Sequence, residues 1–186
     1  MKNEKENLSQ LDVFPDNIQI IKGDLIELAK SKTFDVIAHG CNCQSVMGAG
    51  IAPLMADAFG CDQYPLELLG PNDYKLGLID FKHIMMISGV AVVIEAPTYK
   101  HFTVVNAYTQ LSPRIPDPET GIPLSYRALK EALALIEKLL GGKGVKLGLP
   151  WIGCGLARGD KALVLAIIKE VFENSLTEVY IVEYDR

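Results

Sequence analysis

Two glycines near position 50 offer the most direct means of binding an anion. Gly48 and Gly50 lie in Gly48-Ala49-Gly50-Ile51, just before a run of residues spaced like a helix. Glycine lets the backbone pass close to a ligand, and N–H groups at a helix start point toward an anion. A diphosphate fits this arrangement. A tight loop whose glycines serve only its geometry remains the alternative, because Gly-x-Gly alone is a weak match to the dinucleotide pattern.

A second glycine-containing loop, Pro150–Gly159, follows a predicted strand further along the chain. Two such loops can hold a diphosphate from both sides. Arg158 offers a charge-assisted contact to phosphate, although a loop arginine is more often only solvated. Trp151 is expected to pack rather than to stack on a ligand.

Two polar side chains in turns are candidates for contacting the rest of a nucleotide. Asp24 carries a carboxylate that can accept a hydrogen bond from an amino group such as that of adenine. Asn42 has both a donor and an acceptor, which suits a ribose hydroxyl. Each has a structural alternative, because Asp and Asn in turns often bond the neighbouring backbone.

The other reactive side chains give weaker signals. His39 titrates in a range suited to proton transfer, but a histidine at the end of an apolar strand is more often structural. Cys41-x-Cys43 lacks a second paired set of ligands, so we predict no metal site and no cofactor. The sequence contains neither Gly-x-Ser-x-Gly nor His-Glu-x-x-His, which excludes the commonest serine hydrolases and metalloproteases.

Hydrophobic periodicity predicts the elements that must position these residues. The predicted strands are Ile18–Ile21, Phe34–His39, Phe81–Ile87, Ala91–Glu95, Phe102–Ala107, Val145–Leu149 and Leu176–Glu183, and the predicted helices are Leu25–Lys30, Ile51–Phe59, Tyr126–Leu140 and Lys161–Glu173. Gln110–Pro123 is proline-rich and is expected to be a loop. The alternation predicts an α/β fold, a three-layer α/β/α sandwich around a mixed sheet of about six strands. Ligands in such folds bind beyond the carboxyl ends of strands, where both glycine loops fall.

Composition limits the kinds of partner. The chain has 186 residues, which suits one domain, expected at 17–186 after a flexible polar leader at 1–16. Its net charge of -5 argues against direct nucleic-acid binding, which depends on Lys and Arg neutralising phosphates. The apolar runs are too short for a membrane span. Four cysteines without a signal peptide indicate a reducing compartment, so we expect a cytoplasmic protein.

Taken together, the motifs resemble the ADP-ribose-binding macro domain family. They are Gly23-Asp24-Leu25, the stretch from His39 to Ala52, and Leu149–Leu156, and they occur in the family's order. With Asn106-Ala-Tyr-Thr-Gln110 they extend the resemblance over nearly the whole chain, and the joint match is far more specific than any one segment. The closest likeness is to the branch with terminal ADP-ribose protein glycohydrolase and ADP-ribose 1″-phosphate phosphatase, which has a similar Cys-Asn-Cys or equivalent loop.

The resemblance implies ADP-ribose or a derivative as ligand, with ADP-ribosylated protein as a further partner. Asp24 would bind the adenine amino group, Asn42 through Ile51 the distal ribose and diphosphate, and Ile152–Leu156 the phosphates from the other side. The ligand-binding residues implied are Gly23, Asp24, Leu25, Asn42, Cys43, Met47, Gly48, Ala49, Gly50, Ile51, Ile152, Gly153, Cys154, Gly155 and Leu156.

The resemblance identifies catalytic residues in this sequence less directly than ligand-binding residues. The family's glycohydrolase uses a lysine on a mid-sheet strand and an aspartate after Gly-Cys-Gly-Leu, and these positions align here with Ile94 and Ala157. The catalytic candidates are therefore Asn42, to position the substrate, and His39 or Asp160, to assist proton transfer. Asp160 has the alternative role of capping the helix that follows it.

Three functions are compatible with these residues. We prefer a hydrolase that removes phosphate from ADP-ribose 1″-phosphate or cleaves ADP-ribose from a modified group. The missing lysine and aspartate favour instead an ADP-ribose reader without turnover. A third possibility is a different nucleotide-like ligand, because fold alone does not fix function.

Overall fold

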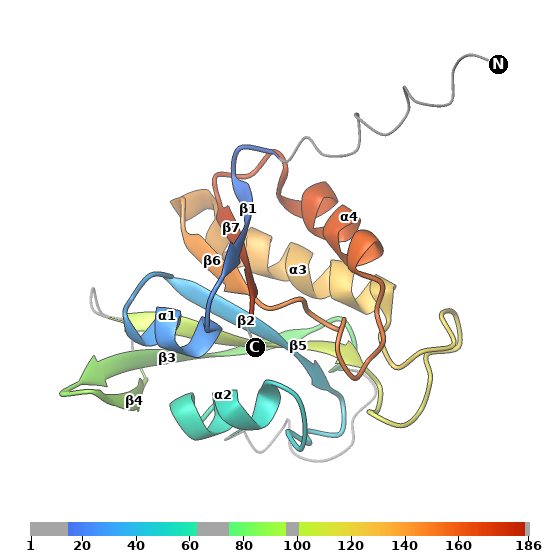
Figure 1. Cartoon of the computed structure of the whole chain (residues 1–186), viewed down its shortest axis with the longest axis horizontal. Helices are drawn as coiled ribbons and strands as arrows, with labels where there is room; N and C mark the ends of the chain where they lie inside the picture. The colour runs from blue at the N-terminus through green and yellow to red at the C-terminus, as the bar shows by residue number, and fades with distance from the viewer. Residues whose placement is uncertain (1–14, 63–74, 96–100, 185–186) are drawn as a thin grey trace.

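A seven-stranded mixed sheet forms the middle layer of the protein (Figure 1). The computed structural model describes residues 15–62, 75–95 and 101–184. The strands are β1 (Ile18–Lys22), β2 (Val36–Asn42), β3 (Ile79–Ile87), β4 (Val90–Ile94), β5 (His101–Gln110), β6 (Lys146–Leu149) and β7 (Glu178–Glu183). Their order is β1-β7-β6-β2-β5-β3-β4. The first five strands in this order run parallel, while β3 pairs antiparallel with both β5 and β4.

Helices cover both faces of the sheet, which confirms the predicted three-layer α/β/α fold. On one face lie α1 (Leu25–Lys30) and α2 (Ala52–Phe59), and on the other α3 (Tyr126–Leu140) and α4 (Lys161–Phe172) (Figure 1). A short 3₁₀ turn, η3 (Gly141–Lys143), follows α3. The sheet has seven strands where about six were expected.

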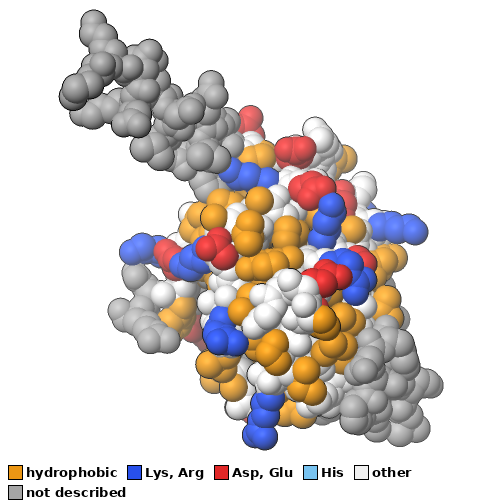
Figure 2. Space-filling view, turned by 90° about the vertical axis from the view of Figure 1, so that its right-hand side faces the viewer, with side chains coloured by type: hydrophobic (Ala, Val, Ile, Leu, Met, Phe, Trp, Pro, Cys, Tyr) orange, Lys and Arg blue, Asp and Glu red, His pale blue; other side chains and the backbone are white. Residues whose placement is uncertain are grey.

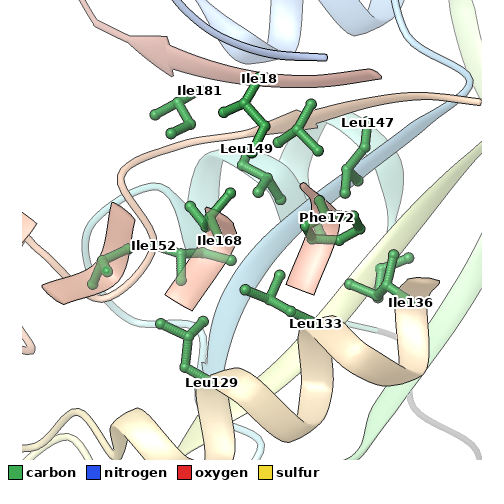
Figure 3. Packing of buried hydrophobic residues seen from close by; sticks show 14 of the residues in the cluster. Ile18, Leu129, Leu133, Ile136, Leu147, Leu149, Ile152, Ile168, Phe172 and Ile181 are labelled. Carbon is green, nitrogen blue, oxygen red and sulfur yellow. The ribbon is translucent and has the colours of Figure 1, made fainter. Parts of the chain in front are cut away.

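The alternation of β2 divides its side chains between two cores. Val36 and Ala38 belong to the core beneath α3 and α4, whereas Ile37 belongs to the core beneath α1 and α2. The first core is shown in Figure 3, where residues from β1, β6 and β7 meet the apolar faces of the two helices. The central strands β2 and β5 are buried along most of their length, as expected for strands covered on both faces, whereas the edge strand β1 is exposed over much of its length.

Two central strands are longer than predicted. We expected β2 to end at His39 and a loop to begin at Gly40, but β2 continues to Asn42 because Cys41 and Asn42 pair with Tyr108 and Gln110 of β5. For the same reason β5 reaches Gln110 rather than ending at Ala107. Small and polar residues near a strand end suggest a loop, but the neighbouring strand supplies partners that local composition does not reveal.

Some predictions concern residues outside the described parts of the chain. Residues 1–14 of the predicted leader are among them. Within the described residues, no helix has the length and apolar character needed to cross a membrane. On the face shown in Figure 2, Lys and Arg side chains lie among Asp and Glu side chains rather than in one basic area.

Candidate ligand-binding cleft

A cleft of about 670 Å³ opens at the carboxyl ends of β1, β6 and β7. The strands are parallel, so the helices that follow them begin at this same edge of the sheet. The lining comes from the turn after β1, the starts of α1, α2 and α4, the loop after β6 and the end of β7. Its residues are Gly23, Asp24, Leu25, Ile26, Gly50, Ile51, Leu54, Pro150, Trp151, Cys154, Gly155, Lys161, Val182, Glu183 and Tyr184.

Two of the three helices that begin near the cleft are capped by a carboxylate. Asp24 Oδ1 accepts hydrogen bonds from two N–H groups at the start of α1, at 2.8 and 3.2 Å. Asp160 Oδ1 does the same for α4, at 2.8 and 3.0 Å. In contrast, no described side chain caps α2, which is preceded by Gly50 in the left-handed conformation with a φ of 68°. The N–H groups at the start of α2 are therefore available to an anion in the cleft.

The loop between β6 and α4 supplies further donors across the cleft. The N–H groups of Ile152 and Cys154 bond carbonyls earlier in the loop, at 2.7 and 3.0 Å. Within the described ranges, the N–H groups of Gly153, Gly155 and Leu156 donate no hydrogen bond. Of these three residues, Gly155 lines the cleft, so this loop and the start of α2 both border it.

A charged cluster lines one end of the cleft. Lys161 Nζ donates to Glu183 Oε1 at 2.7 Å, and the indole N–H of Trp151 donates to the same oxygen at 3.2 Å. The Lys161 ammonium also lies 4.7 Å from the centre of the Trp151 ring. The hydrogen bond from Lys161 lowers the pKa of Glu183. Trp151, expected only to pack, is part of the cleft wall.

The structure brings about half of the predicted ligand-binding residues to the cleft wall. Those that line it are Gly23, Asp24, Leu25, Gly50, Ile51, Cys154 and Gly155, and those that do not are Asn42, Cys43, Met47, Gly48, Ala49, Ile152, Gly153 and Leu156. The motifs missed Ile26, Leu54, Lys161 and the Val182–Tyr184 segment. A usable signal existed for Lys161 and this segment, because the end of a parallel strand and the first residue of a helix both face this edge of the sheet.

Asn42 uses its side chain within its own loop. Its Nδ2 donates to Val46 O at 2.7 Å, and its Oδ1 accepts from the N–H groups of Gln44 and Val46 at 3.1 and 3.3 Å. This is the structural alternative foreseen for an asparagine in a turn. In this conformation Asn42 shapes the loop rather than facing the cleft.

His39 lies in the core and not on the cleft wall. Its Nε2 is 2.7 Å from Asn106 Oδ1, and Asn106 Nδ2 donates to Asp80 Oδ1 at 2.9 Å. Since Asn106 Oδ1 can only accept, His39 carries its proton on Nε2. Burial lowers the pKa of His39 to about 4, so the imidazole is neutral at pH 7. Its position does not support a role in proton transfer at the cleft.

Ile94, aligned with the family's catalytic lysine, does not line the cleft. Ile94 ends β4, the strand at the edge of the sheet opposite β1, whereas the cleft lies at the ends of β1, β6 and β7. Ala157, aligned with the family's aspartate, is buried in the loop between β6 and α4.

The cleft cysteine is a thiol at neutral pH. Cys154 lines the cleft, and burial raises its pKa to about 11, so it is not poised as a thiolate nucleophile. Elsewhere in the described residues, no group of three or more His, Cys, Asp or Glu side chains could hold a metal ion.

Known proteins are similar to this chain in sequence and in fold. No family model matches the chain. It is 31% identical over 179 residues to the Homo sapiens ADP-ribose glycohydrolase OARD1, covering 95% of the chain and 97% of that protein. It is 27% identical over 171 residues to an uncharacterized 17.5 kDa protein of Enterobacteria phage T4, covering 90% and 97%.

Solved structures extend the comparison to the fold. The macrodomain of Thermus aquaticus DarG is similar with a TM-score of 0.60 at 20% identity, covering 91% of this chain and 98% of that one. Thermosipho africanus DarTG in complex with ADP-ribose gives a TM-score of 0.64 at 15% identity, covering 90% of this chain and 42% of that one. A mixed sheet between paired helices, with this cleft and these relatives, defines the class: the chain belongs to the macrodomain family. Within the family, its sequence is similar to that of OARD1.

Proposed function

We propose that this macrodomain binds ADP-ribose and hydrolyses a derivative of it, either ADP-ribose 1″-phosphate or an ADP-ribosyl group on a protein. The observation that carries the proposal is the pair of backbone segments with unused N–H donors at one cleft, the start of α2 and the loop between β6 and α4. A diphosphate between them would accept hydrogen bonds from both sides. The identity with OARD1, whose name is ADP-ribose glycohydrolase, supports hydrolysis.

The positions of the adenine and of the distal ribose follow from this placement of the diphosphate. Asp24 uses Oδ1 to cap α1, and its other carboxylate oxygen would accept from the adenine amino group. The distal ribose would then lie toward the Asn42–Gly48 loop. The cleft volume of about 670 Å³ suits a small-molecule ligand.

The chemistry supported by this site is electrostatic rather than nucleophilic. Fixed N–H groups stabilise negative charge that develops on a phosphate, and they need no rearrangement during the reaction. Holding the scissile bond beside a water supplies a further part of the rate enhancement. In this scheme Cys154 would line the cleft as an uncharged thiol.

A non-catalytic reader is the second candidate. It is favoured by the positions of the catalytic candidates, since Asn42 bonds its own loop and Asp160 caps α4. Titration calorimetry with ADP-ribose tests the binding shared by both proposals. Phosphate release from ADP-ribose 1″-phosphate and ADP-ribose release from modified protein then separate the enzyme from the reader, and binding without either release would leave only the reader.

A leucine at Gly155 should block the cleft without disturbing the fold. A Cβ at Gly155 would meet nothing within 4 Å, and this residue lines the cleft. Overpacking costs roughly 1–3 kcal/mol, so we expect ADP-ribose affinity in Gly155→Leu to fall by about 10-fold or more. Gly142→Leu is the matched control, because that glycine is equally unobstructed but lies in η3. Equal affinities of the two variants by calorimetry would place the ligand elsewhere.

A further inference from the structure

A buried lysine contacts the loop that leads to the candidate diphosphate site. The Lys75 side chain is fully buried, and its Nζ donates to Ser45 Oγ at 2.7 Å. The same ammonium lies 5.4 Å from the centre of the Tyr108 ring. An ammonium group loses hydration on burial, so it is found inside a protein only where polar or aromatic partners compensate for that loss. Lys75 therefore joins the interior to the loop through a specific contact.

The loop end of this contact has an unusual backbone. Ser45 has a φ of 57°, in the left-handed region that residues other than glycine rarely occupy. Such a conformation persists only where its surroundings hold it. Asn42 fixes the loop from within through its bonds to Gln44 and Val46, whereas Lys75 fixes it from the body of the domain. Five residues after Ser45, Gly50 reaches the cleft.

The interior end of the contact belongs to a network across three strands. The Tyr108 hydroxyl, on β5, donates a hydrogen bond to Asp80 of β3, and Asn106 Nδ2 donates one to the same carboxylate. Asn106 in turn bonds His39 of β2. The Asn106-Ala-Tyr-Thr-Gln110 segment thus places a hydrogen-bonded network behind Lys75, although it does not line the cleft.

We propose that Lys75 is a positioning residue for ligand binding: it holds the Cys43–Gly50 loop in the conformation that presents the start of α2 to a diphosphate. The inference rests on the proposed function. If the loop adopts its competent conformation only part of the time, the apparent Kd rises by the inverse of that fraction. A loop that is correctly placed one tenth of the time binds about 10-fold more weakly.

A double-mutant cycle tests this role. We expect Lys75→Met and Ser45→Ala each to weaken ADP-ribose binding about 10-fold in calorimetry. The double variant should bind no more weakly than the weaker-binding single variant, because both substitutions remove the contact between Lys75 and Ser45. Lys130→Met is the control, since Lys130 bonds Glu170 in an exposed pair on α3 and α4. It should bind as the wild type does. Losses that multiply in the double variant would overturn the proposal.

Two further measurements separate positioning from a general loss of stability. Ser45→Asn keeps an acceptor and favours left-handed backbone, so it should bind within about 2-fold of the wild type. Amide hydrogen exchange in Lys75→Met should accelerate in the Cys43–Gly50 loop and not in the α3 helix. If Lys75→Met does not fold, Ser45→Ala and Ser45→Asn decide the question alone. Equal exchange of the loop in Ser45→Ala and the wild type overturns the proposal, whereas an absence of ADP-ribose binding by the wild type overturns only the proposed function.

Discussion

At the scale of single residues, the Asp24 side chain has two roles. Its Oδ1 caps α1, and the residue also lines the cleft. The capping role explains why Gly23-Asp24 precedes a helix, and the lining role agrees with the sequence motif. Because both roles use the same side chain, replacing it with alanine alone cannot show whether it binds a ligand.

Two substitutions at Asp24 separate these roles. Asparagine caps helices as well as aspartate, so Asp24→Asn should leave the free energy of unfolding nearly unchanged, whereas Asp24→Ala should lower it by about 1 kcal/mol. Both should weaken ADP-ribose binding by about 10-fold, because an amide or a methyl group replaces a charged acceptor, whose hydrogen bond contributes about 1.5–3 kcal/mol. Urea unfolding and calorimetry measure the two effects. Full affinity in Asp24→Asn would contradict the assignment of Asp24 to the adenine amino group.

At the scale of elements, the helix starts could be predicted from the sequence more reliably than the strand ends. Asp24 and Asp160 are local capping signals, and the α1 bounds match the prediction at Leu25–Lys30. The ends of β2 and β5 depend instead on each other, since Asn42 and Gln110 are partners far apart in the chain. Local signals therefore located the helix at the cleft edge, while the pairing that extends β2 through Asn42 was missed.

The N-cap of α4 provides a test of whether Asp160 takes part in catalysis. Asp160→Asn should retain both the fold and any hydrolytic rate, because asparagine also caps and the carboxylate serves the helix. Asp160→Ala should lower the free energy of unfolding by about 1 kcal/mol. Turnover of ADP-ribose 1″-phosphate and urea unfolding are the measurements. A rate that collapses in the stable Asp160→Asn variant would make Asp160 a proton-transfer residue after all.

At the scale of the whole molecule, the site combines segments that only the fold brings together. The glycine motifs were visible in the sequence because each is a short local signal. The contacts of Lys161 with Glu183 and of Lys75 with Ser45 were not visible, because they join segments that are far apart in the chain. The same dependence places Ile94 on β4, at the edge of the sheet opposite β1.

The buried network also makes stability depend on pH through His39. Burial lowers its pKa from 6.5 to about 4 in the folded protein. Between these values the unfolded chain binds a proton that the native state does not, so stability is lost as pH falls through this window. The shift corresponds to about 3 kcal/mol at most. Asp80 acts in the opposite direction, since burial raises its pKa and its contribution is lost as pH rises through the folded value.

Comparison of the wild type with His39→Gln isolates the histidine's contribution. Glutamine can donate to Asn106 Oδ1 as His39 does, but it does not titrate. Above pH 6.5 the free-energy difference between the two proteins should be constant, and it should shift by about 3 kcal/mol against the wild type as pH falls to about 4. Urea unfolding at several pH values measures this difference, in which the Asp80 contribution largely cancels. A difference independent of pH would mean that His39 is protonated in the folded protein as readily as in the unfolded chain, contrary to its place in the core.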